Sequence, residues 1–443
     1  MKDATAEEKR ARVAETPKPA REARPRWWWV EPAVWTERML AALEERERVP
    51  VWYALMDKVY RANNLVAAWE KVQANRGAAG VDRQSVGAFG AHAEQYLAEL
   101  HDALRTGTYR AQAVRRCHIP KEGTATTRPL GIPTVKDRIV QTALKHVTEP
   151  IWETRFHTRS YGFRPGRGCK DALREVDRLL HEGCVWVVDA DIQAYFDSID
   201  KKKLMEDVKE VMADGAVLRL IEQYLHQGVL EEGREWTPEH GTPQGAVISP
   251  LLANIYLHPV DEALGAAGHE HVRYADDLVI LCRSREEAEG ALTLLRNLLA
   301  GRGLTLHPEK TRIVDAREPG GFDFLGYHFE RGMRWPRKKA EQRWRTRIRD
   351  LTRRTSGTSM ATTIARVNAV TRGWYEYFKH SHHTTFAKLD GWMRMRLRSI
   401  LRKWHKTKGR GGGCDHLRWP NAYFTKLGLF TMSAAHATAC QSR

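Results

Sequence analysis

The stretches VWVVDADIQAYF (residues 185–196) and HVRYADDLVILC (residues 271–282) decide the fold of this 443-residue chain. In both stretches, a run of β-branched and apolar residues typical of a buried strand meets aspartate. Asp191 ends the first run, and Asp276 and Asp277 lie in a short turn between two apolar runs. Carboxylates among strand residues are unfavourable unless they are paired or bind a metal ion. We therefore expect two neighbouring strands whose ends bring three carboxylates together.

Three converging carboxylates provide the oxygen ligands that Mg²⁺ prefers. Two such ions can lower the barrier to in-line nucleotidyl transfer, one activating the attacking hydroxyl and the other holding the triphosphate and the leaving group. The tetrapeptide YADD alone is weak support, because exposed turns also favour aspartate. Support comes from an ordered series of further segments: GTPQG at 241–245, SPLLANIYL at 249–257, LHPEKT at 306–311 and FLGY at 324–327.

Charge is distributed unevenly along the chain. Residues 331–410 hold 23 Lys or Arg against four acidic residues, a balance of +19, whereas the whole chain carries +17, so the remainder sums to −2. A strongly basic segment on a near-neutral body indicates a polyanionic partner, the alternative being a solvated surface. Tryptophans and tyrosines are interleaved with these cations, and such residues either pack a core or stack on bases.

The remaining patterns predict a mixed α+β body followed by helices. Residues 113–133 predict a β-hairpin with a polar tip, and after Gly332 we expect the strands to stop, because apolar residues then keep helical spacing. No apolar run approaches the ~18 residues of a membrane span, and the N-terminus lacks the apolar core of a signal peptide. We expect a cytoplasmic protein with no membrane partner. Residues 1–25 predict a loose arm, and Trp27–Trp29 are expected to dock on the body.

The ordered segments resemble those of a bacterial group II intron-encoded protein, a reverse transcriptase with maturase function. The resemblance runs from about residue 61 to the C-terminus. It also includes RPLGIPTVKDRIVQTAL (128–144), YGFRPGRG (161–168) and DADIQAYFDSID (189–200). It implies an α+β right-hand polymerase with fingers and palm, followed by an all-α thumb, the maturase domain X. The implied divisions are a partly disordered N-terminal arm and extension (1–58), fingers (59–184), palm (185–331), basic helical thumb or domain X (332–407) and short tail (408–443).

By the same resemblance, Asp191, Asp276 and Asp277 are the catalytic ligands of two Mg²⁺ ions. Lys121 and Arg128 match the fingertip cations that hold the incoming triphosphate. A polar hairpin tip with a Lys and an Arg suits that charge-assisted role, although without the resemblance we would interpret both as exposed loop cations.

Further substrate contacts are implied for Phe196, Gln244 and Lys310. Phe196 matches the aromatic residue under the sugar that excludes a 2′-OH, with core packing as the alternative. Gln244 matches a residue near the nascent pair and the template. Lys310 matches a lysine proposed to protonate pyrophosphate, with a surface charge as the alternative. The primer grip is matched by Phe324, Leu325 and Gly326.

The implied function is RNA-directed DNA synthesis combined with intron RNA binding, splicing and retromobility. The implied partners are intron RNA, a DNA primer or target, and dNTPs. The chain shows no HNH-like series, so we expect it not to cleave the second DNA strand and to use a primer already present at its target. Two alternatives stay open: a splicing-only RNA-binding maturase, and a domesticated or antiviral-defence reverse transcriptase. Phe196 and YADD disfavour an RNA-dependent RNA polymerase.

Overall fold

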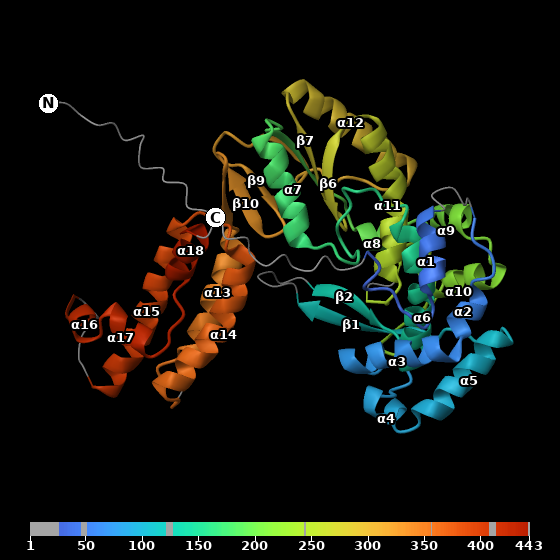
Figure 1. The fold of residues 1–443 in the computed structure, drawn as a ribbon, viewed down its shortest axis with the longest axis horizontal. Helices are drawn as coiled ribbons and strands as arrows, with labels where there is room; N and C mark the ends of the chain where they lie inside the picture. Colours follow the sequence, from blue (N-terminus) through green and yellow to red (C-terminus); the bar gives the residue numbers. More distant parts are fainter. Residues whose placement is uncertain are drawn as a thin grey trace.

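A computed structural model of the chain describes residues 26–45, 51–120, 127–242, 245–355, 357–406 and 413–441. The predicted arm over residues 1–25, Lys121 and Gln244 lie outside these residues. Within them, every helix is too short or too polar to cross a membrane. Figure 1 shows α13–α18 grouped at one end of the molecule, in orange and red, and α2–α5 at the other end, in blue.

The described part of the N-terminal half contains helices and a small sheet. The helices are α1 (Glu37–Glu45), α2 (Met56–Tyr60), α3 (Ala62–Asn75), α4 (Val86–Gly90), α5 (Ala93–Arg105), α6 (Val135–Glu153) and α7 (Cys169–His181). The strands, in spatial order, are β2 (Thr127–Ile132), β1 (Val114–Pro120), β4 (Val229–Glu231) and β5 (Arg234–Trp236). The hairpin predicted over 113–133 is therefore confirmed as β1 and β2, with Ile119 opposite Arg128.

The tryptophan run docks on the body, as predicted. Trp27 and Trp29 pack against the main hydrophobic core, and the Trp27 indole N–H donates to Glu44 at 2.7 Å. Trp28 stays half-exposed. Burial of two large aromatic rings accounts for the order of a short segment with little regular structure.

The central sheet carries the aspartate-bearing strands. Its spatial order is β6 (Glu270–Tyr274), β7 (Asp277–Cys282), β3 (Trp186–Asp191) and β8 (Arg312–Asp315). All its pairings are antiparallel. The accompanying helices are α8 (Tyr195–Ser198), α9 (Lys201–Val211), α10 (Gly215–Leu225), α11 (Ser249–Ala266) and α12 (Arg285–Gly301).

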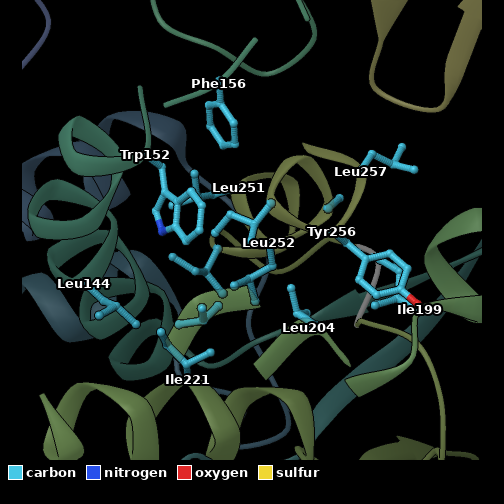
Figure 2. Close-up of a cluster of buried hydrophobic side chains, with 14 of the residues drawn as sticks. Leu144, Trp152, Phe156, Ile199, Leu204, Ile221, Leu251, Leu252, Tyr256 and Leu257 are labelled. Atoms are coloured by element: carbon cyan, nitrogen blue, oxygen red, sulfur yellow. The ribbon is translucent and has the colours of Figure 1, made fainter. Parts of the chain in front are cut away.

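Helix α11 joins the two halves through one buried apolar cluster (Figure 2). Leu251 and Leu252 from α11 share it with Trp152 from α6 and with Leu204 and Ile221 from α9 and α10. Because these side chains are almost fully buried, the helices that flank the sheet are fixed to it as one unit.

A third sheet corrects one prediction from the sequence. Strands β9 (Phe322–Phe324) and β10 (Tyr327–Glu330) continue into β11 (Met333–Pro336), so the strands do not stop at Gly332. Arg331 and Gly332 both have positive φ, 51° and 69°, and form a two-residue hairpin loop. Such a loop matches the twist of paired strands. Arg-Gly between two apolar runs was the signal for this hairpin.

The C-terminal region is helical, as predicted. It contains α13 (Lys338–Leu351), α14 (Met360–Phe378) and α15 (Thr384–Trp404), followed by α16 (Gly413–Arg418), α17 (Asn421–Lys426) and α18 (Met432–Gln441). Most of its tryptophans and tyrosines pack within the bundle, and Trp404 is the most exposed of them, at 44%. The buried carboxylate of Asp390 accepts hydrogen bonds from the backbone of Met432 and Ser433, which ties the tail to the bundle.

Candidate active site

The pairing of β3 with β7 places Asp191 directly opposite Asp277. On the other side of β7, Tyr274 of β6 also faces Asp277, so only Ala275 and Asp276 form the turn between the two strands. Adjacent aspartates on a regular strand would point to opposite faces. The turn removes that constraint, and Asp191, Asp276 and Asp277 all line one cavity of about 530 Å³.

This cavity is strongly acidic. Six carboxylates and three cations line it: Asp189, Asp191, Asp276, Asp277, Glu309, Asp323, Lys310, Arg312 and Arg337. Three ion pairs lie at its edge, and they join Lys310 to Asp191 at 2.9 Å, Arg312 to Asp189 at 3.3 Å and Arg337 to Asp323 at 2.9 Å.

The pKa values of the turn carboxylates reflect this crowding. Burial, together with the charges of Asp189 and Asp276, raises the pKa of Asp277 to about 7. Burial and the charge of Asp191 raise the pKa of Asp276. A divalent cation would reverse both effects, since it supplies the missing positive charge. The donor set therefore fits an oxygen-preferring divalent ion, and Asp191, Asp276 and Asp277 are the residues that would hold it.

Strand β2 carries Arg128, one of the predicted triphosphate-binding cations. Arg128 is exposed, and its positive charge partly offsets the rise in the pKa of Asp276. Gly245 lies against the same strand: a Cβ there would meet the Gly131 carbonyl oxygen at 2.5 Å. Gly245 and strand β2 are thus in close backbone contact. Lys121 lies outside the described residues.

Phe196 lies on the short helix α8, after Ala194 in a left-handed conformation. Its ring is partly buried against the core and contacts the ring of Tyr195 in a tilted arrangement, with 5.3 Å between the ring centroids. Its carbonyl accepts a hydrogen bond from the Thr242 backbone N–H at 2.9 Å. At Gly241 (φ +87°), a Cβ would meet this same carbonyl oxygen at 2.8 Å, so a larger residue would separate the two segments.

The predicted primer-grip residues differ in exposure. Phe324 is fully buried, so its side chain supports the site from the core. Leu325 and Gly326 form the β9–β10 turn, with φ of 45° and 83°. The hydroxyl of Tyr377, on α14, donates to the Leu325 carbonyl at 2.7 Å. On the other side, a hydrogen bond from the Leu325 backbone to Asp277 partly offsets the rise in the pKa of that carboxyl group. The turn therefore contacts both the helical bundle and the acidic cavity.

Two residue groups were missed from the sequence. Arg312 and Arg337 face the cavity, and neither belongs to a recognised segment. Arg273 is almost completely buried, and its guanidinium donates a hydrogen bond to the Ala275 carbonyl in the turn. An apolar flank around a single arginine was the only local signal for Arg273.

Comparison with known proteins identifies the family. Residues 119–329 match the model "Reverse transcriptase (RNA-dependent DNA polymerase)", and residues 341–419 match "Group II intron, maturase-specific domain". Protein YkfC of Escherichia coli is 34% identical over 272 residues, which cover 52% of this chain and 70% of that protein. The chain belongs to the group II intron-encoded reverse transcriptases.

This reverse transcriptase matches less than half the length of two further relatives. The group II intron-encoded protein LtrA of Lactococcus lactis is 36% identical over 48% of this chain and 35% of its own length. The putative COX1/OXI3 intron 1 protein of Saccharomyces cerevisiae is 27% identical over 71% of this chain and 44% of its own length. Among solved structures, a partial Cas6-RT-Cas1–Cas2 complex is 26% identical over 56% of this chain and 41% of that chain, with a TM-score of 0.35.

The charge crowding at Asp277 predicts a stability effect. A raised pKa means that the folded protein holds this proton more tightly than the unfolded chain, so stability falls as pH rises from about 4 to about 7. Asp277→Asn should therefore raise the thermal unfolding midpoint by about 2–4 °C at pH 8 in EDTA. The gain should shrink as pH is lowered toward 4, and differential scanning calorimetry measures it.

The control is Asp315→Asn on β8 of the same sheet. Hydrogen bonds from Arg317 lower the pKa of Asp315, so removal of this charge should give no gain in stability. Equal midpoints for the native protein and Asp277→Asn at pH 8 would contradict a destabilising charge at the turn.

Proposed function

We propose that this reverse transcriptase copies RNA into DNA by attack of a primer 3′-OH on the α-phosphate of a dNTP. The observation that carries the proposal is the convergence of Asp191, Asp276 and Asp277 on one acidic cavity. Two bound Mg²⁺ ions would activate the hydroxyl and stabilise the charge on the triphosphate. The three carboxylates would orient these ions, and the ion pair to Lys310 would open to admit them.

We infer that the remaining residues position the substrates. Arg128, whose positive charge acts on Asp276, would hold the triphosphate beside the carboxylates together with Lys121. Phe196 would lie under the sugar and exclude a 2′-OH, and Gln244 would contact the nascent pair and the template. Lys310 would donate a proton to the departing pyrophosphate.

The primer end is proposed to lie on the β9–β10 turn. Leu325 and Gly326 are both partly exposed there, and the turn contacts Asp277 on one side and α14 on the other. A primer held on this turn would place its 3′-OH beside the carboxylates, and this would provide the proximity that the reaction needs.

We propose that the helical bundle binds the intron RNA and assists splicing. Two observations support this proposal. Residues 341–419 match the maturase-specific domain, and two arginines are exposed there, Arg347 on α13 and Arg354 shortly after its end. Arg345 and Arg349 instead stack on Trp392, at 4.8 and 5.6 Å from its ring, so this tryptophan is covered by cations. Phosphate contacts would then dominate over base stacking on this face.

Primer extension tests the polymerase proposal. On poly(rA) with an oligo(dT) primer and Mg²⁺, we expect extension with dTTP and not with UTP. Asp276→Asn should lower the rate at least ~1000-fold, because it removes charge that stabilises the transition state by several kcal/mol through the ions. Binding of primer–template, measured by fluorescence anisotropy, should be retained.

Asp315→Asn is the matched control, and it should extend at the native rate. Extension by Asp276→Asn at the native rate would contradict the assignment of the carboxylates. Absence of extension by the native protein, with RNA binding intact, would favour the alternative of a splicing-only maturase.

The bundle proposal predicts a change in the salt dependence of RNA binding. Arg347→Glu with Arg354→Glu should weaken binding of the intron RNA and make the slope of log K against log salt shallower by about 1.5, two phosphate contacts being lost. The control replaces two exposed arginines of α12, Arg285→Glu with Arg296→Glu, and should leave the slope unchanged. Filter binding measures both, and equal slopes for all three proteins would contradict the proposed face.

A further inference from the structure

The guanidinium of Arg273 is completely buried beneath the aspartate turn, and all five of its N–H groups are used. Two of them bind the carboxylate of Asp261 on α11, at 2.7 and 2.5 Å. The others reach the side chains of Asn254 at 3.0 Å and Ser160 at 2.8 Å, and the carbonyl of Ala275 at 2.9 Å. The last contact matters most, because Ala275 directly precedes Asp276.

The turn needs such support. Ala275 has φ of 59°, a left-handed conformation that is unfavourable for a residue with a Cβ. Residues in such conformations persist only where their surroundings hold them. Arg273 binds the carbonyl of Ala275, and the backbone on the other side of the turn is held by a second segment.

That second segment is the loop 159–162, which precedes α7. Its backbone pairs with Arg273: the Arg273 N–H donates to Arg159, and the Tyr161 N–H donates to the Arg273 carbonyl. Gly162 then lies directly against the turn, where a Cβ would meet the Ala275 nitrogen at 2.2 Å and the Tyr274 carbonyl carbon at 2.8 Å. The Asn254 amide, which also binds Arg273, donates to the Gly162 carbonyl at 2.8 Å.

We propose that Arg273, with Asp261, Asn254 and Gly162, is a positioning device that fixes the Ala275–Asp276 turn in the geometry needed to hold a divalent ion. The inference rests on the proposed polymerase function but concerns residues outside the acidic cavity. Groups from three separate segments, Arg273 on β6, its partners on α11 and the glycine of the loop 159–162, converge on one strained residue. The charges of Asp276 and Asp277 repel each other, and the clamp keeps the turn from relaxing away from Asp191.

The test replaces the ion pair without leaving a charge unpaired. Arg273→Met with Asp261→Leu removes both buried charges, which folded proteins tolerate far better than the loss of one partner. We expect kcat for dTTP incorporation to fall about 100-fold, as for a small misplacement of reacting groups, with KM for dTTP within about threefold. The affinity for Mn²⁺, measured by electron paramagnetic resonance on the protein alone, should fall about tenfold, because one carboxylate is misplaced.

The matched control is another ion pair of the same region, between Arg302 directly after α12 and Asp207 on α9, replaced as Arg302→Met with Asp207→Leu. It should keep native kcat and Mn²⁺ affinity. Gly162→Ala is the second test, since it displaces the turn without changing charge, and it should lower both quantities in the same direction as the double variant.

A folded double variant that keeps native kcat and Mn²⁺ affinity would overturn the proposal, as would native values for Gly162→Ala. Circular dichroism establishes folding, and if the double variant does not fold, Gly162→Ala decides. If the native protein shows no polymerisation, the proposed function fails by itself, and the Mn²⁺ measurement still tests the clamp.

Discussion

The antiparallel pairing of β3 with β7 is the constraint on which the rest of the molecule depends. It brings Asp191 and Asp277 face to face from positions 86 residues apart in sequence. A concentration of buried carboxylates is unfavourable in the absence of a cation, and here burial, together with the charges of Asp189 and Asp276, raises the pKa of Asp277 to about 7. The burial of apolar side chains along strands Trp186–Asp191 and Asp277–Cys282 offsets the unfavourable free energy of this carboxylate cluster.

Other parts of the fold hold this arrangement. Helix α11 packs its apolar side chains into the shared core and presents Asn254 and Asp261 toward Arg273. The β9–β10 turn links the acidic cavity to α14 through Leu325 and Tyr377. A displacement of the helical bundle would therefore act on the β9–β10 turn, the proposed primer grip. This connection gives a physical route by which RNA bound to the bundle could influence synthesis.

The sequence predicts the convergence of the three carboxylates, because carboxylates among strand residues are unfavourable unless they are paired or bind a metal ion, and several ordered segments accompany them. The confirmed hairpin at 113–133 and the helical C-terminal region follow from periodicity alone. Strand β11 was missed because the helical spacing after Gly332 outweighed the Arg331-Gly332 turn. The β4–β5 hairpin has the same signature, Glu232-Gly233, both with positive φ. Arg273 could not be found, since its side-chain partners Asp261, Asn254 and Ser160 lie 12, 19 and 113 residues away. No local pattern predicts such a pairing.

The most direct test of this account is a crystal structure of the protein with primer–template, a non-hydrolysable dNTP analogue and Mn²⁺, using anomalous scattering to locate the ions. The account predicts ions coordinated by Asp191 together with Asp276 or Asp277, with the triphosphate on the side of Arg128. Nucleotide bound elsewhere, or ions bound without contact to these three carboxylates, would contradict it.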